Sequence, residues 1–273
     1  MIIEQTLNFL NTRYRDRIEY LTIADVRIGI SMTSVRLSDD SCGVSSTYTD
    51  NLQYCKKTMR DYGDFTPLKI RGQKVCSLFE TEKESGTITT LKIACLNAIS
   101  SKIISSGNYK ILENCDPIDL LDLNKKKTIT IVGAFQSYIS RISETSNKLY
   151  VLELNENALG EEQKKFYVPA NDYMNVIPFS DIIIITGLTL VNNTIDNLLA
   201  AIPDKAVVVV VGPSGSVIPD ILFANKVNIV GAIRITKPDI LFDVISEAGG
   251  GFHLFEYCAQ KICIIRDYEA GTR

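Results

Sequence analysis

Five short runs of apolar, mostly β-branched residues divide the second half of the chain. Segments of helical length separate them, and several runs end in glycine. Strands buried on both faces of a parallel sheet are continuously apolar, whereas half-exposed strands alternate. The runs therefore predict a doubly wound α/β sheet with helical crossovers, whose strands are TITIVG (128–133), LYVLEL (149–154), DIIIITG (181–187), AVVVVVG (206–212) and VNIVG (227–231).

The remaining segments predict a smaller α+β unit and a closing hairpin. Apolar residues at helical spacing indicate helices over 2–17 and 87–105. Alternation within residues 26–48, broken by the turn residues 38–41, indicates two or three antiparallel strands. Polar residues with Pro and Gly predict a long loop over 49–73. At the C-terminus, FHLFEY (252–257) and KICIIR (261–266) predict a hairpin that places His253 on a strand.

A lysine run at 125–127, after Pro117, indicates a solvated linker between two domains. We expect an α+β domain over 1–116, a linker over 117–127 and a Rossmann-like domain over 128–273. The parallel sheet should lie only in the second half, and no sheet should cross the linker.

Charge and composition exclude several classes of protein. The net charge is −3, with 15 basic and 14 acidic residues through Asp116 and 14 and 18 after it. Neither half is basic, which argues against nucleic acid. The longest apolar runs are too short to cross a membrane, and no basic segment precedes the apolar N-terminal residues, so we expect no signal peptide. Seven scattered cysteines predict free thiols in a cytoplasmic protein. The sequence leaves open whether the protein forms a homo-oligomer.

Strand ends carry the candidate binding residues, because ligands of doubly wound sheets bind beyond the carboxyl ends of the strands. The segment Gly212-Pro213-Ser214-Gly215-Ser216 combines a chain-turning glycine with hydroxyl groups before a helix, which suits an anionic group. An equally weighted interpretation is a plain strand-to-helix turn with a serine cap. Asn193 and Thr194 follow the strand end at Thr186, where they would cap a helix and could also contact a ligand.

Other signals are weaker. The first strand ends in Gly133-Ala134-Phe135, so the dinucleotide fingerprint G-x-G-x-x-G is absent. Glu153 ends the second strand, but without that glycine loop a surface carboxylate is the better interpretation. Cys258 and Cys263 have poor spacing for a zinc site, and the single histidine, His253, has no evident catalytic partner.

Taken together, these segments resemble the putative heavy-metal-chelation family of two-domain prokaryotic proteins. The resemblance is carried by VRIGISMTSVRL (26–37), CGV (42–44), ACLNAI (94–99), VGAF (132–135), DIIIITGLTLVNNT (181–194) and VGPSGSVIPDILF (211–223). It implies an enolase-N-terminal-like α+β domain followed by a Rossmann-like domain, a site in the cleft between them, and a role with a metal ion or a metal-containing cofactor. The sequence departs from the family pattern near Ile88, Lys92 and Gly215.

The leading hypothesis is a cytosolic protein that binds a metal, a metal-bearing cofactor or an anionic small molecule between the domains. The candidate ligand-binding residues are Thr33, Asn97, Gly133, Phe135, Thr186, Asn193, Thr194, Gly212, Pro213 and Ser214. The alternative is a Rossmann-like transferase or lyase that acts on a small anionic or cofactor-precursor substrate. A third interpretation is a site that has lost its function.

Overall fold

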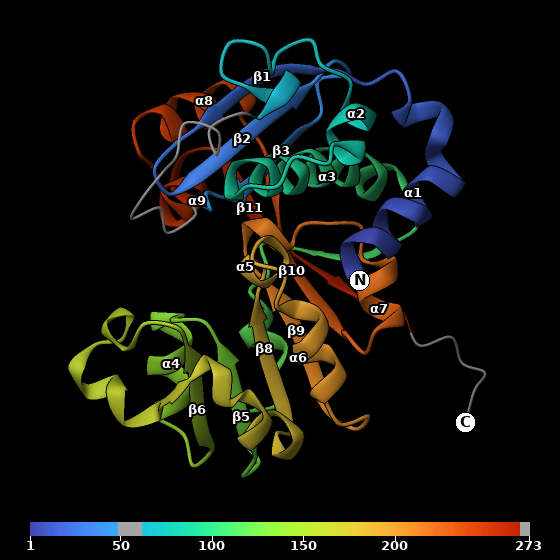
Figure 1. The fold of residues 1–273 in the computed structure, drawn as a ribbon. Coiled ribbons are helices and arrows are strands. Elements are labelled where there is room, and N and C mark those ends of the chain that lie inside the picture. The colour runs from blue at the N-terminus through green and yellow to red at the C-terminus, as the bar shows by residue number, and fades with distance from the viewer. Residues whose placement is uncertain (49–61, 268–273) are drawn as a thin grey trace.

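The computed structural model describes residues 1–48 and 62–267, which form two sheets with helices packed around them (Figure 1). The smaller sheet has three antiparallel strands in the order β1-β2-β3, with Val35 of β2 paired to Val26 of β1 and to Gly43 of β3. The elements of this N-terminal half are α1 (Ile2–Ile18), β1 (Ile23–Ile28), β2 (Met32–Leu37), β3 (Cys42–Ser46), α2 (Val75–Glu80) and α3 (Gly86–Ser106).

Helix α3 is the centre of the N-terminal half. It begins where Ser85 accepts a hydrogen bond from the backbone N–H of Ile88 at 3.1 Å, an N-cap that satisfies one free donor. The helix packs on β3 so closely that a Cβ atom at Gly43 would lie 2.2 Å from the carbonyl oxygen of Ala94. Glycine is therefore required at this crossing, because any side chain would separate the sheet from the helix.

The larger sheet has eight strands in the order β4-β11-β10-β9-β8-β5-β6-β7. The strands from β10 to β7 are parallel, and β11 is antiparallel to both β10 and β4. The strands are β4 (Lys110–Glu113), β5 (Thr128–Val132), β6 (Lys148–Glu153), β7 (Tyr167–Pro169), β8 (Ile182–Thr186), β9 (Val207–Val211), β10 (Ile229–Ile235) and β11 (Ala259–Ile265).

Helical connections complete this half and confirm the predicted Rossmann-like α/β architecture. The α-helices are α4 (Gln136–Ser143), α5 (Leu188–Val191), α6 (Ile195–Ala201), α7 (Asp220–Ala224), α8 (Pro238–Ser246) and α9 (Gly251–Tyr257). Short 3-10 helices are η2 (Gly63–Phe65), η3 (Pro117–Leu120), η4 (Glu156–Ala158), η5 (Glu161–Phe166), η6 (Ala170–Asn175), η7 (Ile177–Phe179) and η8 (Pro213–Gly215).

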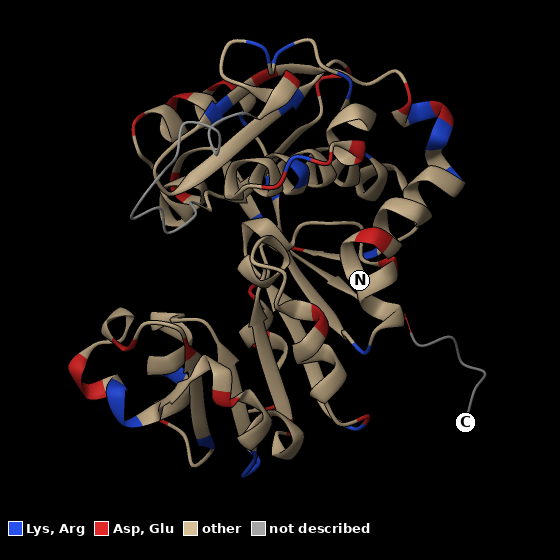
Figure 2. Cartoon of the chain, in the orientation of Figure 1, with Lys and Arg blue, Asp and Glu red and all other residues tan. Residues whose placement is uncertain are grey.

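The apolar runs form the core, as their composition predicts. Residues 182–185 of β8 and 208–210 of β9 are almost entirely buried. Figure 2 shows acidic and basic residues interspersed over both halves, whereas β8 and β9 carry neither. No helix in residues 1–48 and 62–267 combines the length and apolar character that crossing a bilayer requires.

Two sequence-based expectations about the fold are wrong. Strand β4 precedes the expected linker, yet it pairs with β11, with Leu112 opposite Cys263. The larger sheet therefore contains strands from both sides of the linker. The open edge of β11 supplies the hydrogen bonds for β4. Residues 251–257 form α9 instead of a hairpin strand, because Leu254 and Cys258, four apart, are both buried on one side of the chain. His253 is consequently exposed on a helix.

The loop predicted at 49–73 and the thiols are described in part. Residues 62–73 contain η2 and turns, and residues 49–61 lie outside the described residues. Six cysteines are free, as predicted, and Cys55 lies outside the described part of the chain. The boundaries 1–116, 117–127 and 128–273 stay a prediction.

The two halves share a hydrophobic core. Helix α8 packs on β1 and β2, on the side of the small sheet away from α3 (Figure 1). Met32 and Val44 of the small sheet belong to the same buried cluster as Leu241, Phe242 and Ile245 of α8. The C-terminal part of the chain thus completes the core of the N-terminal half.

Candidate functional sites

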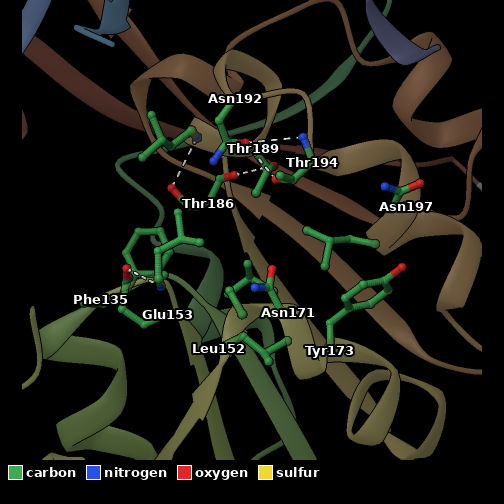
Figure 3. A pocket seen from close by; sticks show the side chains of 17 residues that line it. Phe135, Leu152, Glu153, Asn171, Tyr173, Thr186, Thr189, Asn192, Thr194 and Asn197 are labelled. Atoms are coloured by element: carbon green, nitrogen blue, oxygen red, sulfur yellow. Dashed lines mark hydrogen bonds between the residues drawn. The ribbon is translucent and has the colours of Figure 1, made fainter. Parts of the chain in front are cut away.

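A pocket of about 350 Å³ lies at the carboxyl ends of β5, β6 and β8; we call it the strand-end pocket (Figure 3). Strand β5 lies between β8 and β6: after β5 the chain adds β6 and β7 on one side of it and then returns to add β8 on the other. Such a switch point opens a crevice where ligands of doubly wound sheets bind. The lining residues include Gly133, Phe135, Leu152, Glu153, Asn171, Tyr173, Thr186, Leu188, Thr189, Asn192, Thr194, Asn197 and Leu198.

Among the described residues that line the pocket, Glu153 is the acidic one, and the local backbone sets its position. Oε1 of Glu153 accepts hydrogen bonds from the N–H groups of Leu154, at 2.8 Å, and Asn155, at 3.2 Å. Gly133 has φ +105°, a left-handed conformation that favours glycine. The ring of Phe135 stacks on Tyr138 with centroids 5.5 Å apart. The described residues that line the pocket include no Lys or Arg.

Hydroxyl and amide groups form the opposite wall of the strand-end pocket, as Figure 3 shows. The Thr189 hydroxyl donates to the carbonyl of Thr186 at 2.7 Å. Oδ1 of Asn192 accepts from the Thr194 hydroxyl at 2.7 Å. Thr194 occupies the N-cap position of α6, but its side chain makes no capping hydrogen bond. Asn193, with φ +57°, is exposed beside the pocket and does not line it.

The turn at Gly212–Ser216 lies elsewhere, packed between the two halves. Gly212 has φ +109°, and the N–H of Gly215 donates to its carbonyl at 2.9 Å. The Ser214 hydroxyl accepts from the backbone N–H of Ser46 at 2.8 Å and donates to the Ser46 hydroxyl at 3.0 Å. Ser214 is therefore buried in a contact between η8 and β3.

Asn97 of α3 joins the same contact. Its Nδ2 donates to the carbonyls of Val44 at 2.7 Å and of Pro213 and Ser214 at 3.2 Å each. Its buried Oδ1 has no hydrogen-bond partner in the described part of the chain. Thr33 is fully buried in β2, where its hydroxyl bonds to that of Thr47 at 2.9 Å. Asn97 therefore ties the halves together, whereas the hydroxyl of Thr33 bonds within the N-terminal half.

A second cavity, of about 300 Å³, is lined by both halves; we call it the junction cavity. Its polar wall from α3 consists of Asn97, Ser101 and Ser105, spaced four residues apart on one face of the helix. Its cations are Lys102 of α3 and Arg234 of β10. The remaining polar lining comes from Asp39, Asp40, Ser41, Cys42 and Ser216.

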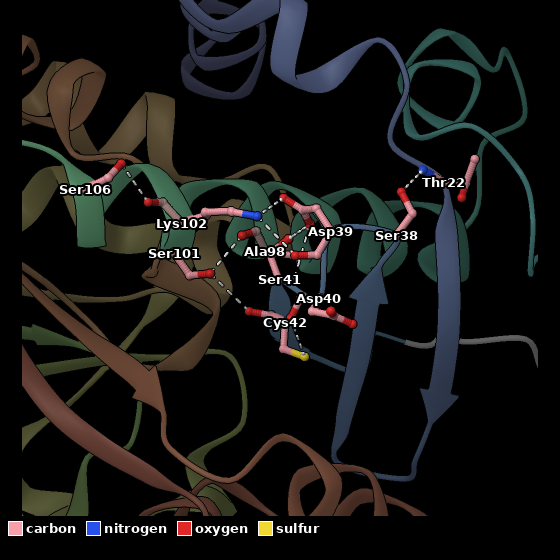
Figure 4. Close-up of polar contacts among 10 residues, drawn as sticks. All are labelled: Thr22, Ser38, Asp39, Asp40, Ser41, Cys42, Ala98, Ser101, Lys102 and Ser106. Carbon is pink, nitrogen blue, oxygen red and sulfur yellow. Dashed lines mark hydrogen bonds and ion pairs between the residues drawn. The ribbon is translucent and has the colours of Figure 1, made fainter.

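Each cation at the junction cavity has an acidic partner. Lys102 Nζ lies 2.9 Å from Asp39 Oδ2 (Figure 4), and Arg234 pairs with Glu113. Asp39 Oδ1 also accepts from the Ser41 hydroxyl at 2.6 Å. Burial alone would raise the pKa of Asp39, but the hydrogen bonds from Ser41 and Lys102 outweigh it and hold the pKa below its usual value. The carboxylate is therefore ionised at neutral pH.

The described residues do not fit a bare heavy-metal ion. In residues 1–48 and 62–267, no three His, Cys, Asp or Glu side chains are grouped to hold one. Burial raises the pKa of the Cys42, Cys258 and Cys263 thiols. Because the thiolate is the metal-binding form of cysteine, these thiols are poor ligands as they stand.

The structure therefore separates eight of the ten predicted site residues into two groups. Gly133, Phe135, Thr186 and Thr194 meet at the strand-end pocket. Asn97, Gly212, Pro213 and Ser214 lie at or next to the junction of the halves, and of these Asn97 lines the junction cavity. Thr33 and Asn193 line neither cavity.

Sequence reasoning missed most of the polar lining of the junction cavity. The polar stripe Asn97-Ser101-Ser105 on helix α3, most of which is buried, was the available signal. Where the sequence departs from the family pattern, Ile88 is buried in the core and Lys92 Nζ donates to the carbonyl of Thr81 at 3.4 Å. Neither side chain lines the junction cavity.

Comparison with known proteins identifies relatives of both halves. A family model described as "putative heavy-metal chelation" (DUF364) matches residues 116–264, and a second model with the same description matches residues 12–100. No curated protein matches the chain.

Among the solved structures that match are two that cover almost the whole chain. A DUF364 protein of unknown function from Pyrococcus horikoshii has a TM-score of 0.75 and 21% identity, over 97% of this chain and 98% of that one. Another from Desulfitobacterium hafniense has a TM-score of 0.71 and 15% identity, over 96% and 99%. At these identities the likeness shows the shared fold.

Proposed function

The chain belongs to the putative heavy-metal chelation family, and from that premise we propose that it binds a small anionic or metal-bearing molecule in the junction cavity. The observation that carries the proposal is the lining of this cavity by both halves, with a cation from each: Lys102 from α3 and Arg234 from β10. The free thiols fit the cytoplasmic location expected from the sequence.

Lys102 and Arg234 can change partners at little cost. Their side chains are 55% and 33% exposed, and the acidic partners Asp39 and Glu113 are 27% and 46% exposed. Ion pairs this close to solvent contribute about 0–1 kcal/mol. An anionic ligand bound between Lys102 and Arg234 would therefore replace two weak ion pairs with charge–charge interactions inside the junction cavity, which is more enclosed.

The metal, in this proposal, arrives already held by its own ligands. The junction cavity offers hydroxyl and amide groups at Asn97, Ser101, Ser105 and Ser216, which suit the oxygen atoms of a chelate. Its buried thiol, Cys42, has a raised pKa. A chelate whose negative charges face Lys102 and Arg234 fits this lining better than a bare cation.

A matched pair of substitutions on α3 tests the junction cavity. Ser105 lines it, whereas the neighbouring exposed Ser106 does not. We expect Ser105→Trp to fill the cavity and Ser106→Trp to leave it open. Isothermal titration with citrate, ferric citrate and inorganic phosphate should show binding of at least one probe, weakened at least about tenfold, or 1.4 kcal/mol, in Ser105→Trp alone.

Circular dichroism establishes that both variants are folded. Binding of zinc ions alone as tightly as the chelate would overturn the proposal. So would equal affinity in the parent and Ser105→Trp, or the absence of binding by all three anionic probes at millimolar concentration.

A further inference from the structure

We propose that the strand-end pocket is a separate binding site for a ribonucleoside or a nucleoside derivative without phosphate groups. This site does not depend on the junction cavity, because the two cavities have no lining residue in common. It would also serve the transferase or lyase activity that is the alternative expectation from the sequence.

The size and place of the strand-end pocket suit a nucleoside. Its volume of about 350 Å³ is at the lower end of the roughly 300–1,000 Å³ of small-molecule sites, which leaves little room for a dinucleotide. It opens at the switch point between β5 and β8, where doubly wound sheets bind their ligands.

Glu153 is placed to bind a ribose. It ends β6, the strand that follows β5 in the chain, and an acidic residue near this position in doubly wound sheets accepts the ribose hydroxyls. The N–H groups of Leu154 and Asn155 hold Oε1. Oε2 has no partner in the described part of the chain, so it is available to accept from a diol.

The remaining lining suits a flat heterocycle. Leu188 and Leu198 provide apolar surface, and Tyr173 provides an aromatic ring. The amides of Asn171 and Asn197 both donate and accept, as the edge of a nucleobase requires. In Figure 3 both amides and the ring of Tyr173 border the same open space.

Phosphate groups are disfavoured in the strand-end pocket. The described lining contains no Lys or Arg, and Glu153 would repel an anion. Phe135 stands at the start of α4, where the second glycine of a dinucleotide loop would let pyrophosphate approach the backbone. Nucleosides should therefore bind at least as tightly as the corresponding nucleotides.

The carboxylate is tested with a matched pair. Glu153→Gln keeps an oxygen for the N–H groups of Leu154 and Asn155 but removes the charge. The control is Glu156→Gln, because Glu156 is exposed in η4 and does not line the pocket. Titration with adenosine, guanosine, cytidine and uridine should show at least one binding with Kd below about 1 mM. Glu153→Gln should weaken it at least about fivefold, and Glu156→Gln less than twofold.

A second pair on α6 tests the place of binding. Asn197 lines the pocket and Ala200, also exposed on α6, does not. Asn197→Trp should abolish nucleoside binding, whereas Ala200→Trp should preserve it. The 2′-deoxynucleoside should bind about fivefold more weakly than the ribonucleoside.

The proposal fails if none of the four ribonucleosides binds, if the 5′-triphosphate binds more tightly than its nucleoside, or if folded Asn197→Trp binds like the parent. It also fails if Glu153→Gln leaves the affinity unchanged. Citrate and phosphate binding at the junction cavity should be the same in all of these variants.

Discussion

Gly215 lies in a turn where a side chain would be crowded. It is buried, and an added Cβ atom would lie 3.0 Å from Cγ1 of Val210 and 3.4 Å from Cα of Gly187. Its φ is outside the left-handed region, so crowding is the constraint. We expect Gly215→Asp to lower the free energy of unfolding by about 3 kcal/mol, because it overpacks the turn and buries a carboxylate.

Gly160→Asp is the control for Gly215→Asp, and urea unfolding measures the stability of both variants. An added Cβ there would meet nothing closer than Gln163 Oε1 at 3.7 Å, and Gly160 is the exposed N-cap of η5, where aspartate is favoured. We expect a change within about 0.5 kcal/mol. Equal unfolding midpoints for Gly215→Asp and the parent would show that the turn is open enough to accept an anion.

Asp116 ties three elements of the larger half together. It is the N-cap residue of η3, and its carboxylate accepts a hydrogen bond from Tyr138 of α4 and lies 2.6 Å from Lys261 Nζ of β11. Burial raises its pKa, but the bonds from Lys261 and Tyr138 outweigh burial, so the pKa is below its usual value. A carboxylate whose pKa is lower in the folded protein than in the unfolded one stabilises the fold at pH values above the unfolded pKa, near 3.9. This stabilisation is lost as the pH falls through the pKa of the folded protein.

We therefore expect Asp116→Asn to lower the free energy of unfolding by about 1 kcal/mol at pH 7. The difference from the parent should shrink as the pH falls below about 4. Asp122→Asn, which removes the exposed ion pair with Lys125, should leave the urea midpoint unchanged at pH 7. If the free energies of unfolding of Asp116→Asn and the parent differed by a constant amount from pH 7 to pH 3, the lowered pKa of Asp116 would be contradicted.

The two halves should unfold together because each completes the core of the other. Phe242 and Ile245 of α8 pack in one cluster with Met32 and Val44 of the small sheet. Asn97, whose buried Nδ2 bonds to the carbonyls of η8, adds a polar connection between the halves. We expect one calorimetric transition with equal calorimetric and van't Hoff enthalpies. Two resolved transitions would show that the halves are independent.

Local composition by itself determined the class of the fold. A strand buried on both faces has to be apolar throughout, so the runs at 128–133, 181–187 and 206–212 specify a parallel sheet wherever they pack. The ordered motifs also identified the family, which the match over 116–264 confirms. Four candidate residues meet at the strand-end pocket because the carboxyl ends of parallel strands share one edge.

Tertiary contacts decided what local patterns leave open. Residues 252–257 contain apolar residues at both helical and strand spacing, and the burial of Leu254 with Cys258 selects the helix. Strand β4 exists because β11 offers an open edge. The sequence of the turn at Gly212–Ser216 predicts an anion site, yet the Ser214 hydroxyl is already hydrogen-bonded to Ser46, 168 residues away in the chain. Such partners are set by packing between distant segments, which no short stretch of sequence encodes.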